Sequence, residues 1–270
     1  MPKKGEGRMF DLNTAKVLFM DKNYERAAEM FYEGASEGNP EAAFDYAYCL
    51  MNGYGVARDP ALAKSFYVFA SQKVGEAAYN LSVMYLHGIG VKRDYKRSFE
   101  YMKDAAELGV IEAQLYLGVA YTLGSLFEPD IVSISLIPYH TPEYNSQAYY
   151  IEGEVPDYEE DEEERIAAVR HDPLSAFTWF KNAAKHSPDY VEELSGKGKY
   201  LYARCFIDGL GTDFNRDRGH GLMLLAAIDG SEEAMAYIET DAPYLLENLN
   251  NPELVHKIRR VEGISAPKEY

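Results

Sequence analysis

Apolar and small residues recur along this chain at helical spacing. The segment 41–59, EAAFDYAYCLMNGYGVARD, is echoed position for position by the segment 76–94, EAAYNLSVMYLHGIGVKRD, 35 residues further on. In both segments the apolar residues fall three or four positions apart, which is the spacing of one face of an α-helix. The pattern therefore predicts a helix that returns with a fixed period.

Weaker copies of this first helix follow, and a second helix recurs beside it. The first helix is restated in segment 112–121 and, after an interruption, in segment 199–211. In the second helix a small residue follows the opening position by four, and a bulky apolar residue follows that by three. The predicted opening positions are Asn23, Asp59, Asp94, Asp172 and Asp217.

The residues at the helix ends explain these boundaries. Asp or Asn at an opening position can accept hydrogen bonds from the unpaired amides of the first turn, which is worth roughly 1 kcal/mol. The first helix ends in a Gly-x-Gly step, as at Gly53 and Gly55, because glycine adopts the left-handed conformation that closes a helix. Each repeat thus contains a helix, a glycine turn and a capped helix. This period is typical of a solenoid, whose units bury their apolar faces against their neighbours.

The complete pattern resembles the Sel-one-like repeat, a relative of the tetratricopeptide repeat. It contains Ala-x-x-x-Leu-(Gly/Ser)-x-x-Tyr, Gly-x-Gly-Val, Asp-x-x-(Lys/Arg)-(Ala/Ser) and a final Ala-Ala-Glu-x-Gly, almost all present in segment 76–111. Segment 41–75 fits nearly as well, and later units fit less, with Thr212 where valine is usual. The resemblance implies an all-α, right-handed α-solenoid (superhelix) of helix-turn-helix repeats. It also implies a scaffold or adaptor for protein partners, without catalysis.

On this pattern the chain is predicted to form a single α-solenoid domain, 1–270. We expect the last helix of its C-terminal cap to pack Val255, Ile258 and Val261 inward and to leave Lys257, Arg259 and Arg260 in water, because terminal units need a polar outer face. The alternative is that this basic segment is a second contact surface. The predicted parts are an N-terminal capping repeat 12–40, repeats 41–75 and 76–111, a repeat 112–187 split by the insertion 125–171, a repeat 198–231 and the C-terminal helical cap 232–262.

The insertion falls where the fourth unit should make its glycine turn. Segments 131–137 and 147–155 are short and rich in β-branched or aromatic residues, so a small β-hairpin is one prediction for this arm and plain disorder is the alternative. A partly ordered arm would pack on its own groove or engage a partner. Residues 157–164 contain seven acids in eight positions, which either begin a solvated helix or dock a basic partner.

The first helices supply the candidate binding surface. The resemblance implies that they line a concave face, where positions not used for stacking would form a groove. Tyrosine suits such a surface because it offers large area at low entropy cost and a polar tip, although Tyr48 and Tyr116 could instead shield seams between helices. The predicted partner-binding residues are Asp45, Tyr48, Asn52, Asn80, Met84, His87, Tyr116, Arg204 and Asp208, together with Tyr158, Glu159, Glu160 and Asp161 of the acidic run.

Charge limits the class of partner. The formal net charge is −17, and removing the seven acids of the run still leaves −10, so the acidity belongs to the whole chain. Direct nucleic-acid binding is disfavoured, because a polyanion gains affinity from lysine and arginine. We therefore expect a protein partner, basic where it meets the acidic run. The alternative is an acidic inhibitor or nucleic-acid mimic that binds a basic nucleic-acid-handling enzyme.

Sequence signatures of catalysis are missing. The Gly-x-Gly steps lack the third glycine of a dinucleotide site, and the chain has no Gly-Lys-Ser/Thr loop. No His-Glu-x-x-His or Cys-x-x-Cys spacing occurs, so we predict no enzyme, cofactor or metal site. Cys49 and Cys205 are expected to be reduced. No apolar run is long enough for a membrane helix, and the first residues do not form a secretory signal, so a cytoplasmic location is expected.

Overall fold

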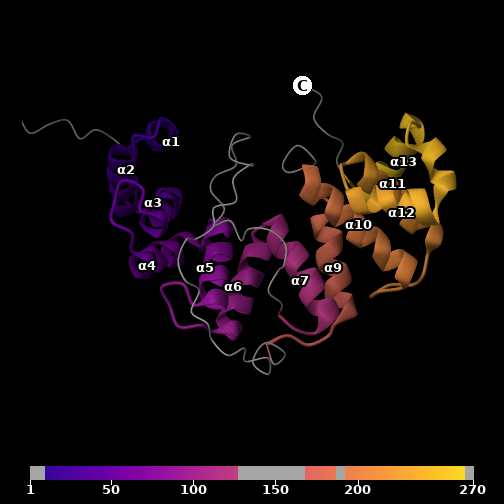
Figure 1. The fold of residues 1–270 in the computed structure, drawn as a ribbon, viewed down its shortest axis with the longest axis horizontal. Helices are drawn as coiled ribbons and strands as arrows, with labels where there is room; N and C mark the ends of the chain where they lie inside the picture. The colour runs from indigo at the N-terminus through magenta and orange to yellow at the C-terminus, as the bar shows by residue number, and fades with distance from the viewer. Residues whose placement is uncertain (1–9, 127–167, 187–191, 265–270) are drawn as a thin grey trace, which may run out of the picture. The chain divides into compact units, whose positions relative to one another are not determined.

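The computed structural model describes residues 10–126, 168–186 and 192–264, and every element in these ranges is a helix (Figure 1). This confirms the predicted all-α class built from repeated helical pairs. The hairpin expected in segments 131–137 and 147–155 lies outside the described residues. The chain divides into two compact units, which meet in sequence between Leu108 and Gly109.

The first unit contains three helical pairs that pack in chain order. The first helix of the second pair buries small residues, such as Ala43 and Ala47, and the second helix of that pair adds the large buried side chain of Tyr67 to the same cluster. Close packing of large side chains against small ones is the general way in which helices approach one another. The helices are α1 (Leu12–Met20), α2 (Tyr24–Ser36), α3 (Pro40–Asn52), α4 (Pro60–Ala70), α5 (Gly75–His87) and α6 (Tyr95–Glu107).

The second unit repeats this arrangement. Helix α7 pairs with α9 and α10 with α11, while α13 packs against α11. Phe180 of α9 fills the space beside Gly118 of α7, where a β-carbon would lie 2.3 Å from the ring. The elements are α7 (Ile111–Leu123), α9 (Pro173–Ala183), α10 (Glu192–Asp208), α11 (Arg216–Ile228), α12 (Glu232–Asp241), the 3-10 helix η1 (Pro243–Asn248) and α13 (Pro252–Glu262).

The predicted caps are mostly confirmed. The side chains of Asp59, Asp94 and Asp172 accept hydrogen bonds from backbone amides of the first turns of α4, α6 and α9. Asn23 precedes α2 without such a bond. The prediction of Asp217 was wrong, because Asn215 caps α11 through the amide of Arg218 at 3.1 Å.

The small residue that packs against the neighbouring helix also lies two residues earlier in α11 than predicted. Gly219, four residues after Asn215, is buried where an added β-carbon would lie 2.6 Å from the Ile207 side chain. Gly221, which the sequence pattern favours, has its nearest neighbours at an ordinary 3.6 Å. Packing against α10 therefore sets the register of α11.

The glycine turns are held by one recurrent backbone bond. The amide of each capping residue donates to a carbonyl near the end of the preceding first helix, from Asp59 to Leu50 at 2.8 Å and from Asp94 to Tyr85 at 2.9 Å. In the split repeat Asp172 donates to Tyr121 at 2.9 Å, although the whole insertion lies between them in sequence. This bond therefore forms both with and without inserted chain.

The second glycine of each Gly-x-Gly step makes a contact between successive repeats. Gly55 and Gly211 have φ of 68° and 66°. A β-carbon on Gly55 would lie 2.2 Å from the carbonyl oxygen of Tyr24 at the start of α2. On Gly211 it would lie 2.0 Å from the carbonyl oxygen of Pro173 at the start of α9. Glycine is required at both positions for conformation and for space.

The last helix differs from the prediction. Arg259 of α13 is buried, with 6% of its surface exposed, and Val261 is 71% exposed. The prediction was therefore wrong at these two residues, whereas Val255 and Ile258 pack partly buried against the core and Lys257 and Arg260 are exposed, as predicted. Arg259 stands eight residues after its cap, Asn251, as the buried Tyr67 and Phe180 do after theirs. Arg259 thus stands at the position that holds a buried aromatic residue in α4 and α9, the second helices of their repeats.

Candidate functional site

The predicted groove residues of the first unit lie on α3 and α5 and are mostly enclosed. Asp45, Tyr48, Asn80 and Met84 are buried, whereas Asn52 and His87 are partly accessible. The Asn52 amide donates to the Tyr48 carbonyl at 2.9 Å. Asn52 and His87 are therefore the residues of this group that a partner can reach directly, and binding through the other four stays a prediction.

Asp45 is a carboxyl group in an unfavourable place. Burial holds its pKa well above the usual range, opposed by the positive charge of Lys16 and reinforced by the negative charge of Glu41. Its Oδ2 atom is buried without a hydrogen-bond partner among the described residues. One turn further along α3, burial and then the charge of Asp45 raise the pKa of the Cys49 thiol. The interior of this unit thus disfavours negative charge.

We expect Asp45→Asn to increase stability at neutral pH. The folded-state pKa lies above the unfolded value of about 3.9, so the folded chain retains a proton that the unfolded chain releases. Unfolding free energy therefore falls as pH rises from about 4 through the raised folded-state pKa, and asparagine avoids this loss. Urea unfolding of parent and variant at pH 4 and pH 7 measures the effect. A variant that is less stable than the parent by the same amount at both values would contradict it.

In the second unit the structure brings two predicted residues together. The Arg204 Nε lies 2.8 Å from the Asp208 Oδ2, one turn further along α10, and an Arg204 Nη donates to the Tyr200 hydroxyl at 3.2 Å. The bond to Asp208 raises the pKa of Arg204. Tyr116 of α7 is buried. The acidic-run residues Tyr158, Glu159, Glu160 and Asp161 lie outside the described part of the chain.

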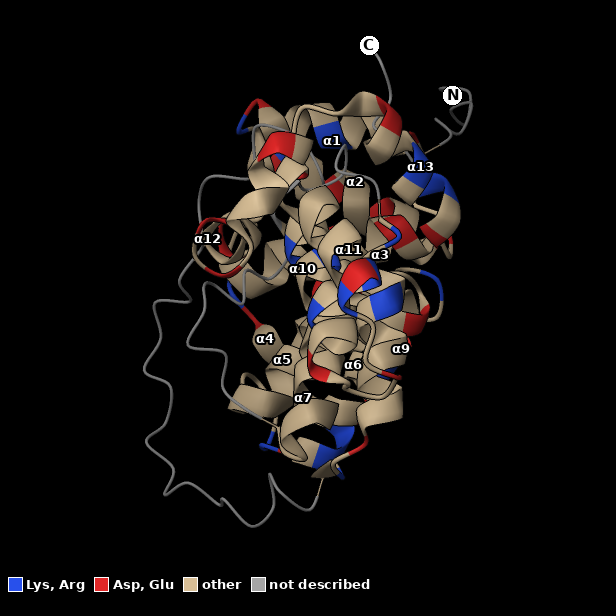
Figure 2. Ribbon diagram, turned by 90° about the vertical axis from the view of Figure 1, so that its right-hand side faces the viewer, with Lys and Arg blue, Asp and Glu red and all other residues tan. Residues whose placement is uncertain are grey.

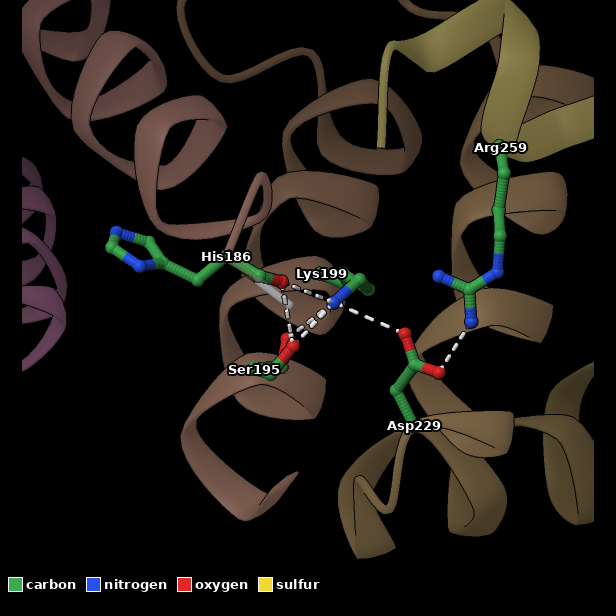
Figure 3. A network of polar contacts seen from close by, with 5 residues as sticks. All are labelled: His186, Ser195, Lys199, Asp229 and Arg259. Atoms are coloured by element: carbon green, nitrogen blue, oxygen red, sulfur yellow. Dashed lines mark hydrogen bonds and ion pairs between the residues drawn. The ribbon is translucent and has the colours of Figure 1, made fainter. Parts of the chain in front are cut away.

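A buried polar network that the sequence did not predict crosses the second unit (Figure 3). The Lys199 ammonium lies 3.0 Å from the Asp229 carboxylate, and an Arg259 Nη bonds to the other oxygen of that carboxylate. Lys199 also donates to the Ser195 hydroxyl and, at 3.2 Å, to the His186 carbonyl. All three charged side chains are almost fully enclosed. One carboxylate thus joins α10, the end of α11 and α13.

The repeat register shows how unusual this network is. Aligned on the glycine that ends each first helix, Lys199 stands where α3 and α5 have the buried alanines Ala43 and Ala78. The corresponding residue of α7 is the buried Gln114, whose side-chain oxygen lies 3.1 Å from the His186 Nε2. A polar residue at an alanine position is the sequence signal that could have indicated this network.

The Ser195–Lys199 pair has the residue types of a serine nucleophile and a lysine base. Burial lowers the pKa of Lys199, opposed by the charge of Asp229. Ser195 has no exposed surface, and its hydroxyl donates to the His186 carbonyl at 2.9 Å. A substrate carbonyl therefore cannot approach the hydroxyl in this structure. We interpret the network as a structural connection that fixes the C-terminal helix.

A second ion pair connects the same helix. Arg218 of α11 makes two bonds to the Glu262 carboxylate, at 2.7 and 2.8 Å, and its guanidinium lies 4.3 Å from the centre of the Phe206 ring. The bond to Glu262 raises the pKa of Arg218. Helix α13 is therefore attached to α11 at both Arg259 and Glu262.

The described residues contain no group placed to hold a metal ion and no helix able to span a membrane. Within the described ranges no group of three or more histidine, cysteine, aspartate and glutamate side chains is placed to hold a metal ion. Cys49 and Cys205 are free and buried, as predicted. Among the described helices, none combines the length and apolar character needed to span a membrane.

Comparison with known proteins decides the family. The model of the Sel1 repeat matches residues 18–39, 40–73, 75–110, 111–132, 165–188 and 197–231, which is more than half of the chain. The chain belongs to the Sel1 repeat family. Sel1 repeat proteins are generally scaffolds for protein interaction and typically have no enzymatic activity.

A solved structure of a Sel1 repeat protein agrees on the fold. The crystal structure of a Sel1 repeat protein from Oxalobacter formigenes is 16% identical and has a TM-score of 0.63, covering 94% of this chain and 84% of that one. A protein of uropathogenic Escherichia coli strains, c5321, described as a protective antigen displaying an SLR fold, is 19% identical with a TM-score of 0.40. That match covers 94% of this chain and 54% of the antigen. No curated protein matches the chain significantly.

Proposed function

We propose that this Sel1 repeat protein is a non-catalytic adaptor that binds a protein partner through its first helices and through the acidic insertion. The observation that carries the proposal is a set of equivalent positions at the ends of these helices, each directly before the constant glycine. The side chains there are accessible to different degrees and differ in every repeat: Asn52, His87, Leu123 and Asp208. We call them the helix-end residues.

Constant and variable positions have different roles in this arrangement. The glycine after each helix-end residue is fixed by its left-handed conformation, with φ between 71° and 78° at Gly53, Gly88, Gly124 and Gly209. The helix-end side chain carries no such requirement and can vary in charge and size. Repeat proteins commonly present variable residues from a constant framework to their partners. This separation supports partner recognition rather than packing as the role of the helix-end residues.

Affinity capture from the native cell lysate tests the proposal. The intact chain is compared with a form in which residues 128–166 are replaced by a Gly-Ser linker, and with the variant His87→Ala, Leu123→Ser, Asp208→Ala. We expect one defined protein to be captured by the intact chain, with at least about tenfold less recovered by each altered form. Raising the salt concentration should weaken the part of the binding that depends on the charges of the acidic insertion.

A matched control separates recognition from general surface effects. Glu253→Ala with Val261→Ser changes exposed residues of α13 and should leave capture unchanged. The proposal fails if no specific protein is captured at either salt concentration. It also fails if capture is the same for the intact chain, the linker form and the helix-end variant.

A further inference from the structure

We infer that one face of the first unit, formed by α2 and α4, docks a basic amphipathic helix of another protein. This face, the α2–α4 face, consists of the apolar residues Tyr32, Leu62, Phe66 and Phe69 and the acidic residues Glu25 and Glu29, which stand seven and three residues before Tyr32 and so share its side of α2. It lies on second helices, whereas the proposed adaptor function uses the ends of first helices. The inference therefore does not depend on that function.

The apolar part of the face is exposed and well supported. Tyr32 is 51% exposed, Phe69 42% and Leu62 43%. The Tyr32 ring lies 5.2 Å from the Tyr46 ring and 6.4 Å from the Phe66 ring, and these two partly buried rings lie 4.9 Å apart, measured between centroids. An exposed aromatic side chain held by two others is ordered before any partner arrives, which lowers the entropic cost of binding.

Residue spacing places the apolar side chains of α4 together. Leu62, Phe66 and Phe69 follow one another at intervals of four and three residues, which puts them on one side of the helix. The contact between the Tyr32 and Phe66 rings shows that this side faces α2. Isolated exposed apolar residues are normal on protein surfaces, but a contiguous set of this kind is typical of an interaction site.

The α2 side of the face carries a net negative charge. Glu25, Glu29, Glu33 and Glu37 recur every fourth residue along α2 and are all exposed. Like charges at this spacing repel one another and destabilise a helix. The single basic residue of α2, Arg26, pairs with Glu29 at 2.7 Å. On α4, Lys64 stands two residues after Leu62 and so faces away from this surface.

Exposed apolar residues beside acidic ones indicate the chemistry of the partner that binds this face. Lysine and arginine side chains can pair with the glutamates and place their charge against aromatic rings, while the apolar side of an amphipathic helix covers Tyr32 and Phe69. A nucleic acid or an anionic membrane would meet repulsion. Acidic and basic residues are intermixed on many other helices (Figure 2), whereas α2 carries its acids in one line.

Binding of a defined probe tests the inference on the full chain. The probe is a short fluorescein-labelled amphipathic helix of leucine and lysine, and its affinity is measured by fluorescence anisotropy. We expect Phe69→Ser to weaken binding about tenfold or more. Val68→Ser is the matched control, because Val68 is also exposed at 38% but lies about 100° around the same helix. It should change the affinity less than about twofold.

A second pair of variants tests the charge. Glu25→Gln with Glu29→Gln should weaken binding of the probe about tenfold, whereas Glu100→Gln with Glu107→Gln removes the same charge from α6 and should have little effect. The first variant loses like-charge repulsion along α2 together with the Arg26–Glu29 pair, and these effects are of similar size and opposite sign, so its melting temperature should change little. Weaker binding at an unchanged melting temperature cannot result from unfolding.

Three results would overturn the inference: no binding of the probe, equal loss in face and control variants, or a concentration-dependent dimer that the Phe69→Ser variant abolishes. The last result would identify a second copy of the chain as the occupant. The variant His87→Ala, Leu123→Ser, Asp208→Ala should bind the probe normally. That comparison distinguishes failure of the adaptor proposal from failure of this one.

Discussion

Asp229→Ala is expected to lower the unfolding free energy by about 3–5 kcal/mol, because it leaves two buried cations without their shared counterion. Lys199 and Arg259 are both enclosed, and both contact the Asp229 carboxylate. Removing one partner of a buried ion pair is costly because the remaining charge is neither solvated nor neutralised. Urea unfolding followed by circular dichroism gives the change.

An exposed ion pair provides the control. Asp208→Ala removes a carboxylate at the end of α10 that also pairs with an arginine, but this pair is accessible to water, so we expect a loss below about 1 kcal/mol. Arg259→Met leaves the Lys199–Asp229 pair in place and should lie between the two. Equal losses for Asp229→Ala and Asp208→Ala would show that the buried network does not hold the C-terminal helix.

Gly55→Ala should be the second severe change. Alanine in the left-handed conformation costs about 1–2 kcal/mol, and its β-carbon would lie 2.2 Å from the Tyr24 carbonyl oxygen. Backbone atoms of α2 would have to move, which adds about 1–3 kcal/mol. We therefore expect a total loss of about 2–5 kcal/mol in urea unfolding.

Gly53, in the same turn, separates the cost of the left-handed conformation from the cost of the steric clash. Its φ of 78° is equally left-handed, but its nearest neighbour for a β-carbon lies at an ordinary 3.5 Å. Gly53→Ala should therefore lower the unfolding free energy only by the cost of the left-handed conformation, about 1–2 kcal/mol. If both variants lose the same amount, the contact between repeats contributes nothing.

The sequence predicted those features that one residue can specify locally. The left-handed glycines and the caps at Asp59 and Asp94 depend on groups within a few residues of each other, so spacing alone identifies them. The choice between Asn215 and Asp217 was different, since both side chains can cap a helix. Contact of Gly219 with Ile207, a residue of another helix, decides it.

Burial was less predictable than position. Asn80 and Met84 stand where the repeat pattern placed them, on α5, yet they are fully enclosed, because exposure depends on side chains contributed by other elements. Arg259 looked solvent-facing for the same reason: its counterion, Asp229, stands at the end of another helix, and sequence spacing does not reveal their contact. The Arg204–Asp208 pair lies within one helical turn and could have been expected.

The bond between Asp172 and Tyr121 has a consequence for how this protein can change. The closing bond forms whether a few residues or a long segment lie between its ends, so this bond does not limit the length of the intervening sequence. Each doubling of a flexible loop costs only about 0.6 kcal/mol. The position between α7 and α9 is thus a natural graft point, where a foreign peptide or domain can be exchanged without redesigning the repeats.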